Sequence, residues 1–125
     1  MIVRKLDELV GTERDVAWGN GQSRRFLLEH DGMGYSLTDT IINAGTESRL
    51  SYENHLEACY CISGRGEVEC GGSVYPIEPG TMYALDAHDE HVLRAFETLR
   101  LVCVFSPALR GPERHDLSQR RASRY

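Results

Sequence analysis

Three side chains of different chemistry stand out along the chain: the carboxylate of Glu57, the phenol of Tyr83 and the imidazole of His91. Carboxylates are seldom buried without a cation or a metal, so a carboxylate among apolar residues needs neutralisation. Oxygen and nitrogen donors from three strands can bind a metal on one side and leave positions open for a substrate. The same residues are also typical of separate structural roles: a half-exposed acid, a core aromatic and a surface turn histidine. Their spacing alone leaves both interpretations open.

Strand parity indicates that all three side chains point inward. Successive strand residues face opposite sides of a sheet, so Glu57 shares a face with His55 and Cys59. By the same rule Tyr83 is in phase with Leu85, and His91 with Leu93.

The elements that would position these residues are short strands. Turn signals recur every eight to twelve residues, from Gly32 and Gly34 through Pro79-Gly80 to Asp89, a spacing typical of a sandwich or barrel. The segments between them are rich in β-branched and aromatic residues: GYSLTDTII, HLEACYCI, GEVEC, VYPI, TMYALDA, HVLRAF and LRLVCVF. LDELV near the start predicts one helical turn. We therefore expect an all-β fold.

The segment from His55 to Ile62 predicts a contact with a second copy of the chain. Leu56, Ala58, Tyr60 and Ile62 share the face opposite to Glu57. An apolar face of this size is seldom left in water. We expect a homodimer formed through this sheet.

Length and charge limit the alternatives. A chain of 125 residues suits one domain, here residues 1–125. The net charge is −5; five arginines from Arg110 onward oppose Glu113 and Asp116 for a local charge of +3, which leaves −8 on residues 1–109. An acidic body disfavours nucleic acid as a partner.

The apolar stretches are too short to span a membrane, and no signal peptide is recognisable. The four cysteines form no C-x-x-C pair. We therefore expect a cytoplasmic protein with reduced thiols.

Three runs resemble the ectoine synthases, a branch of the cupin superfamily: NHLEACYCISGRG, YPIEPGTMYALDAHDEHVLRA and LRLVCVFSPALRG. The similarity extends from Met1 to about Asp116. Cupins usually carry an H-x-H pair and a later histidine after a P-x-G turn. Here the first motif reads His55-x-Glu57, and Tyr83 stands three residues after Gly80. The resemblance implies a single cupin-type (jelly-roll) barrel with a C-terminal lid and tail at about residues 110–125.

The resemblance also implies the activity and the cofactor. The reaction would be the metal-dependent ring closure of N-γ-acetyl-L-2,4-diaminobutyrate to ectoine with loss of water, catalysed by a lyase that makes a compatible solute. The metal ligands would be Glu57, Tyr83 and His91. The family indicates Fe(II), although the ligand types also suit other divalent transition metals.

The family's pocket residues correspond to further positions of this chain. Tyr52 and His55 would be catalytic and contact the substrate. Arg24 and Arg25 have opposite strand parity, so only one of them can point inward, and the resemblance favours Arg25 as the residue that binds the substrate carboxylate. The other substrate-binding positions are Thr40, Cys103, Phe105, Glu113 and His115, of which Glu113 and His115 would belong to the lid.

The sequence departs from the family pattern at two places, the C-terminal tail and Trp18. The tail from Gln119 to Tyr125 differs from the usual family ending. Trp18 differs in its offset from SRR, so a site role, a rim role and a dimer contact all remain open for it. Two other functions are compatible with the sequence: a non-catalytic cupin that binds a small amino-acid-like ligand, and a cupin oxygenase.

Overall fold

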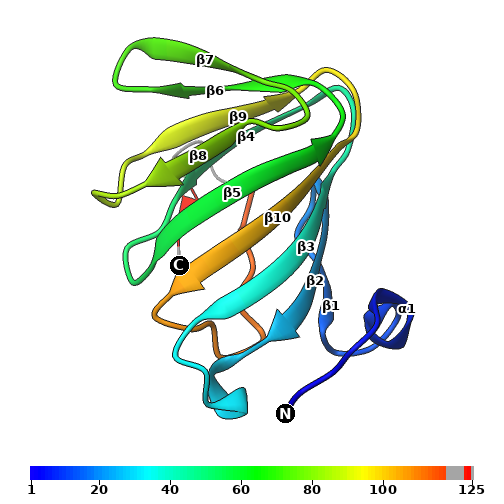
Figure 1. Ribbon diagram of the computed structural model, residues 1–125. Helices are drawn as coiled ribbons and strands as arrows, with labels where there is room; N and C mark the ends of the chain where they lie inside the picture. Colours follow the sequence, from blue (N-terminus) through cyan, green and yellow to red (C-terminus); the bar gives the residue numbers. More distant parts are fainter. Residues whose placement is uncertain (118–122, 125) are drawn as a thin grey trace.

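Two sheets form the body of the protein, and all their strand pairs are antiparallel except β11 with β4. The computed structural model describes residues 1–117 and, for the backbone, 123–124. The first sheet has the order β1 (Asp15–Ala17), β2 (Gly21–Leu27), β3 (Ser36–Ile42), β10 (Leu99–Ser106), β5 (Leu56–Ser63) and β8 (Met82–Leu85). The second has the order β11 (Ser123–Arg124), β4 (Thr46–Ser51), β9 (His91–Ala95), β6 (Gly66–Cys70) and β7 (Ser73–Ile77). The chain passes repeatedly between the sheets, which curve around a shared interior (Figure 1).

The two short helices lie outside the sheets. The predicted helical turn is confirmed as α1 (Leu6–Leu9), which lies beside the sheet near β1 in Figure 1. A 3-10 turn, η1 (Glu29–Asp31), follows β2. In the described part of the chain, no helix has both the length and the apolar character needed to cross a bilayer.

Alternating burial explains why the central strands form. In β10, Leu99, Leu101, Cys103 and Phe105 are each at most 3% exposed, while the residues between them are half-buried or exposed. Burial of these side chains against the second sheet is the main force that holds the layers together. The inward face of β10 therefore carries these four residues.

Four strands, β1, β2, β4 and β11, lie outside the seven segments predicted to be strands. β1 has only three residues and pairs solely with β2. β4, with the sequence TESRLS, is mostly polar, yet Glu47 accepts a hydrogen bond at 2.9 Å from Arg94 of the paired strand β9. A strand whose outer face is stabilised by charge shows little apolar alternation, which is why the pattern did not reveal it.

Candidate functional site

A small cavity lies between the two sheets, with a volume of about 40 Å³. Eight of the predicted site residues line it: Arg25, Thr40, Tyr52, Glu57, Tyr83, Cys103, Phe105 and His115. Three others do not. His55 and Glu113 line a neighbouring cavity, and His91 lies behind Tyr52, with 6.1 Å between the ring centroids.

Glu57 is a buried acid on β5, opposite Phe105 of β10 and Leu85 of β8. The residue is 7% exposed, which excludes the half-exposed interpretation. No ion pair within residues 1–117 includes it. Burial raises the pKa of Glu57 to about 7, although hydrogen bonds with Cys59 and Tyr52 oppose this shift. A nearby cation would restore the ionised carboxylate, so the site favours one.

Tyr83 lies beside Glu57 because the register of β8 places it directly opposite Cys59, two residues along β5. It is partly buried and lines the cavity. Burial raises the pKa of Tyr83 well above its ordinary value, and the neighbouring Cys59 and Glu57 act in the same direction. The phenol is therefore neutral unless a positive charge is close by.

His91 belongs to the opposite sheet and is 2% exposed, so the surface-turn interpretation is wrong. Its Nδ1 lies 3.1 Å from the carbonyl oxygen of Asp89, which identifies Nδ1 as the protonated nitrogen. Its buried Nε2 has no hydrogen-bond partner within residues 1–117. Burial lowers the pKa of His91. A neutral imidazole with an unpaired Nε2 is the form that ligates metals, so its chemistry fits the O,O,N donor set.

Arg25 is 1% exposed and points into the interior, whereas Arg24 points outward to Asp39 at 2.7 Å. The Arg25 guanidinium donates to the carbonyl oxygens of Gly111 at 2.7 Å and Glu113 at 2.5 Å. These contacts hold the segment of residues 110–117, here called the C-terminal segment, against the barrel.

The C-terminal segment closes one side of the cavity. Nε2 of His115 lies 3.0 Å from the hydroxyl of Tyr52, and both residues are buried. Glu113 accepts hydrogen bonds from the backbone N–H groups of Arg110 and Gly111, which turn the chain locally. Of the expected tail, Gln119 to Tyr125, residues 119–122 and 125 lie outside the described residues.

His55 lies at the rim and faces Pro107. Its Nδ1 is 2.8 Å from the Pro107 carbonyl oxygen, so Nδ1 carries the proton in the neutral ring. Its ring lies edge-on to Phe105, with centroids 6.2 Å apart. His55 is thus separated from the cavity by the Phe105 wall.

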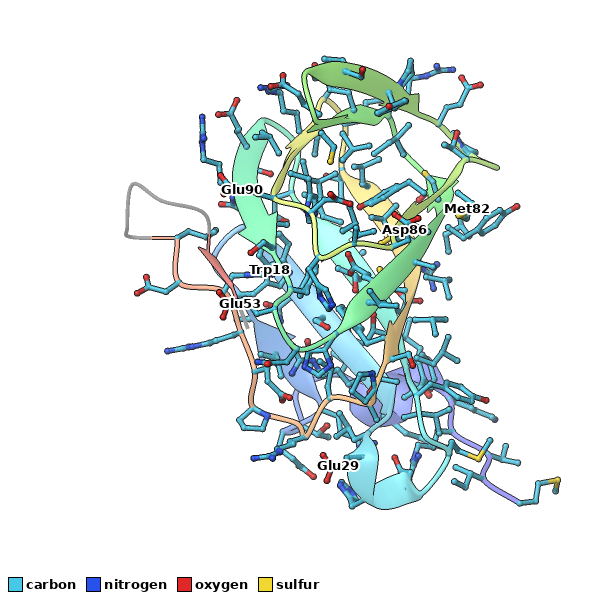
Figure 2. All side chains as sticks on the ribbon, turned by 90° about the vertical axis from the view of Figure 1, so that its left-hand side faces the viewer. Trp18, Glu29, Glu53, Met82, Asp86 and Glu90 are labelled. Atoms are coloured by element: carbon cyan, nitrogen blue, oxygen red, sulfur yellow. The ribbon has the colours of Figure 1, made fainter. Side chains whose placement is uncertain are left out.

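Trp18 is the cavity residue that sequence reasoning left open. It is 6% exposed, lines the cavity and packs edge-on against His115, with centroids 6.1 Å apart. In Figure 2 it lies beside the C-terminal segment. Its indole Nε1 has no hydrogen-bond partner within the described chain. A tryptophan at position 21, nearer to Arg25, is excluded by the backbone. A Cβ on Gly21 would lie 1.8 Å from the Ile41 carbonyl oxygen. Nothing in the local pattern around Trp18 indicated its direction.

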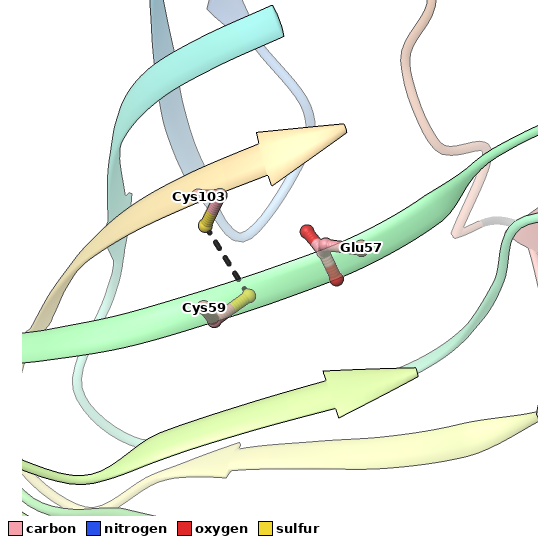
Figure 3. Close-up of side chains that lie close together, drawn as sticks. All are labelled: Glu57, Cys59 and Cys103. Atoms are coloured by element: carbon pink, nitrogen blue, oxygen red, sulfur yellow. Dashed lines mark hydrogen bonds between the residues drawn. The ribbon is translucent and has the colours of Figure 1, made fainter. Parts of the chain in front are cut away.

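Cys59 was also missed as a cavity residue. It lies directly opposite Cys103 in the sheet, and the two sulfurs are 3.3 Å apart. Figure 3 shows both thiols and the Glu57 carboxylate close together. Strand parity places Cys59 on the inner face, but the sequence indicates only that its thiol is reduced and gives it no role in the site.

The two curved sheets and the cavity between them define a small cupin-type protein. The fold is shared with a predicted oxalate decarboxylase from Thermotoga maritima, at a TM-score of 0.70 and 16% identity over 85% of this chain and 99% of that one. The chain belongs to the ectoine synthase family, whose model matches residues 1–122.

Named relatives and a crystal structure agree with this membership. L-ectoine synthases from Desulfatibacillum aliphaticivorans and Halalkalibacterium halodurans are 62% and 57% identical to this chain. Each alignment covers 93% of this chain and 92% of the relative. The crystal structure of ectoine synthase from P. lautus matches with a TM-score of 0.86 and 56% identity, over 89% of this chain and 81% of that chain.

Proposed function

We propose that this protein is an ectoine synthase, a lyase that closes N-γ-acetyl-L-2,4-diaminobutyrate into ectoine with loss of one water. Family membership over nearly the whole chain carries this proposal. The cavity supports it, because the buried acid Glu57 lines an interior space between the sheets suited to a dehydration.

The metal would be held by Glu57, Tyr83 and His91, and we propose Fe(II) as the ion. The observation in favour is the buried, unpaired Nε2 of His91 together with the Glu57 carboxylate. When bound, a divalent metal supplies Lewis acidity that stabilises negative charge on the substrate's amide oxygen. The open ligand positions of the O,O,N set would leave room for that oxygen.

The remaining residues would fold the substrate and handle its protons. The substrate's own α-amine is the nucleophile, and its ordinary pKa of about 8 leaves a neutral fraction near pH 7. Tyr52, hydrogen-bonded to His115, is positioned to pass a proton to the departing hydroxyl, and His55 at the rim is the second candidate. Thr40, Cys103 and Phe105 would form the wall that excludes water.

Arg25 would bind the substrate carboxylate after exchanging partners. In the closed form its guanidinium is occupied by the carbonyl oxygens of Gly111 and Glu113. A cavity of about 40 Å³ admits a few water molecules but not an acylated amino acid. The C-terminal segment, with Glu113 and His115, would therefore move as a lid when the substrate binds.

We further propose a single domain that acts as a homodimer in the cytoplasm. The outer face of β5 and its neighbours exposes Leu56, Tyr60, Ile62, Met82 and Val104 at 38–61%. Apolar residues grouped in this way are typical of an interface.

The test is product formation under strict anaerobiosis. Metal-loaded protein is incubated with N-γ-acetyl-L-2,4-diaminobutyrate, and ectoine is measured by NMR. We expect one ectoine to form for each substrate molecule consumed, in the absence of oxygen. Binding without turnover would instead identify a non-catalytic cupin, and turnover only in the presence of oxygen would identify an oxygenase.

A further inference from the structure

Two thiols share the cavity with Glu57. Cys59 on β5 and Cys103 on β10 are each 2% exposed, and their sulfurs are 3.3 Å apart. One ligand atom from each of Cys59, Cys103 and Glu57 lies within 4.8 Å of the others. In Figure 3 the three side chains lie close together on the neighbouring strands β5 and β10. The proposed reaction uses Cys103 only as a wall and does not use Cys59 at all.

The geometry of these groups suits a metal ion of a different kind. Two sulfurs on a tetrahedral zinc ion, at about 2.3 Å each, stand about 3.8 Å apart. The pair at 3.3 Å would have to widen by about half an ångström, a shift that side-chain rotation can supply. The adjoining cavity of about 40 Å³ has room for an ion and a water as its fourth ligand.

We propose that Cys59, Cys103 and Glu57 form a binding site for a thiophilic divalent ion such as Zn²⁺ or Cd²⁺. Each thiol loses its proton to solvent and donates an electron pair to the ion, so that no oxidant or reductant is needed. The site shares Glu57 with the proposed catalytic metal. Occupation by a thiophilic ion therefore removes one ligand of the catalytic site and inhibits turnover.

The donor types explain why the two sites would select different ions. Thiolate sulfurs favour soft or borderline ions, whereas the carboxylate, phenolate and imidazole set suits iron and other transition metals. Only the inhibition depends on the proposed function; the binding of the ion does not.

Two other cysteines provide matched controls. The thiol of Cys61, two residues further along β5, lies 3.3 Å from the carbonyl oxygen of Ser63. Cys70, on the second sheet, lies 3.7 Å from the carbonyl oxygen of Glu90. Neither belongs to a three-residue donor group in the part of the chain that the structure describes.

The experiment titrates metal-free protein with Cd²⁺ and follows the ultraviolet charge-transfer absorption of cadmium bound to thiolate. We expect saturation at one ion per chain. Cys103→Ser and Cys59→Ser each lower the band to half or less and weaken binding at least tenfold. Cys61→Ser and Cys70→Ser leave the absorption band and the cadmium affinity unchanged. His91→Ala also retains the band, because His91 serves only the proposed catalytic site. Far-UV circular dichroism identifies any variant that fails to fold, and Cys103→Ala then replaces Cys103→Ser.

A second measurement adds Cd²⁺ to the iron-loaded protein and determines both metals after gel filtration. We expect one iron lost for each cadmium gained, in parallel with the loss of ectoine formation. An undiminished band in the Cys103 and Cys59 variants, or no band in the wild type, overturns the site. Cadmium and iron bound together at full occupancy overturns the sharing of Glu57.

Discussion

At the scale of single residues, burial changes the chemistry of ordinary side chains. Glu57 and His91 would each be unremarkable on a surface, but here the acid has a pKa of about 7 and the imidazole is held neutral. Both changes follow from the removal of water. A cation bound by the proposed ligands would offset the cost of burying the carboxylate.

Trp18 gives a prediction at this scale, because a buried indole N–H without a partner costs about 1–3 kcal/mol. We expect a polar atom of the bound substrate to accept this hydrogen bond. Trp18→Phe keeps most of the wall but removes the donor. It should lower kcat/KM by about tenfold, while the iron content stays the same and the melting temperature does not fall. Steady-state kinetics and calorimetry check this; unchanged kcat/KM would contradict a role for Nε1.

At the scale of elements, salt bridges join the start of the chain to the barrel. Asp31 in η1 accepts hydrogen bonds from Arg4, Arg14 and the backbone N–H of Leu28. Its side chain is 7% exposed. Burial would raise the pKa of Asp31, but these hydrogen bonds outweigh it and hold the pKa well below its ordinary value.

Asp31→Asn should therefore destabilise the fold by about 2–3 kcal/mol near pH 7, because two arginines lose their counter-charge. The folded pKa of Asp31 lies below the unfolded one, so its contribution is complete above about pH 4 and is lost as the pH falls through the folded pKa. Denaturant unfolding at pH 7 and pH 3 checks this. The wild type and the variant should differ less at pH 3; an equal difference at both values would contradict the assignment.

Elements with a clear local sequence pattern could be predicted, and contacts between distant residues could not. The strand of residues 66–70 was expected with the bounds that the structure has, because Gly64, Gly71 and Gly72 bracket it. The contacts of Arg25 with Gly111 and Glu113 could not be predicted, since 86 and 88 residues separate the partners. Parity gave the inward direction of Glu57 and Tyr83. Parity also gave the inward direction of His91, and only the family likeness predicted that these three side chains hold one metal.

At the scale of the whole molecule, one sheet has an apolar outer face. Tyr60 is 48% exposed and Met82 61%, and Met82 points away from the body in Figure 2. A second copy packed on this face would bury both residues. The charged residues Arg24, Asp39 and Arg100 lie on the same sheet and would form a polar rim.

We expect light scattering to give the mass of a dimer. Tyr60→Glu, which puts a charge into the centre of the face, should shift the mass to that of a monomer at micromolar concentration. Val74→Glu is the matched control, since Val74 is 50% exposed on β7 of the other sheet and should leave the dimer intact. A dimer that survives Tyr60→Glu but not Val74→Glu would move the interface to the second sheet.

In the proposed reaction, a metal held by Glu57, Tyr83 and His91 makes ring closure possible. The most direct measurement titrates metal-free protein with Fe(II) under anaerobic conditions and follows ectoine by NMR. Activity should rise in proportion to iron and stop at one ion per chain. His91→Ala should lose tight iron binding and at least about a thousandfold in rate, as expected when several kcal/mol of charge stabilisation are removed. The exposed His30 provides the control, because His30→Ala should behave like the wild type. Full turnover in protein without detectable metal, or in His91→Ala, would contradict this role of the metal.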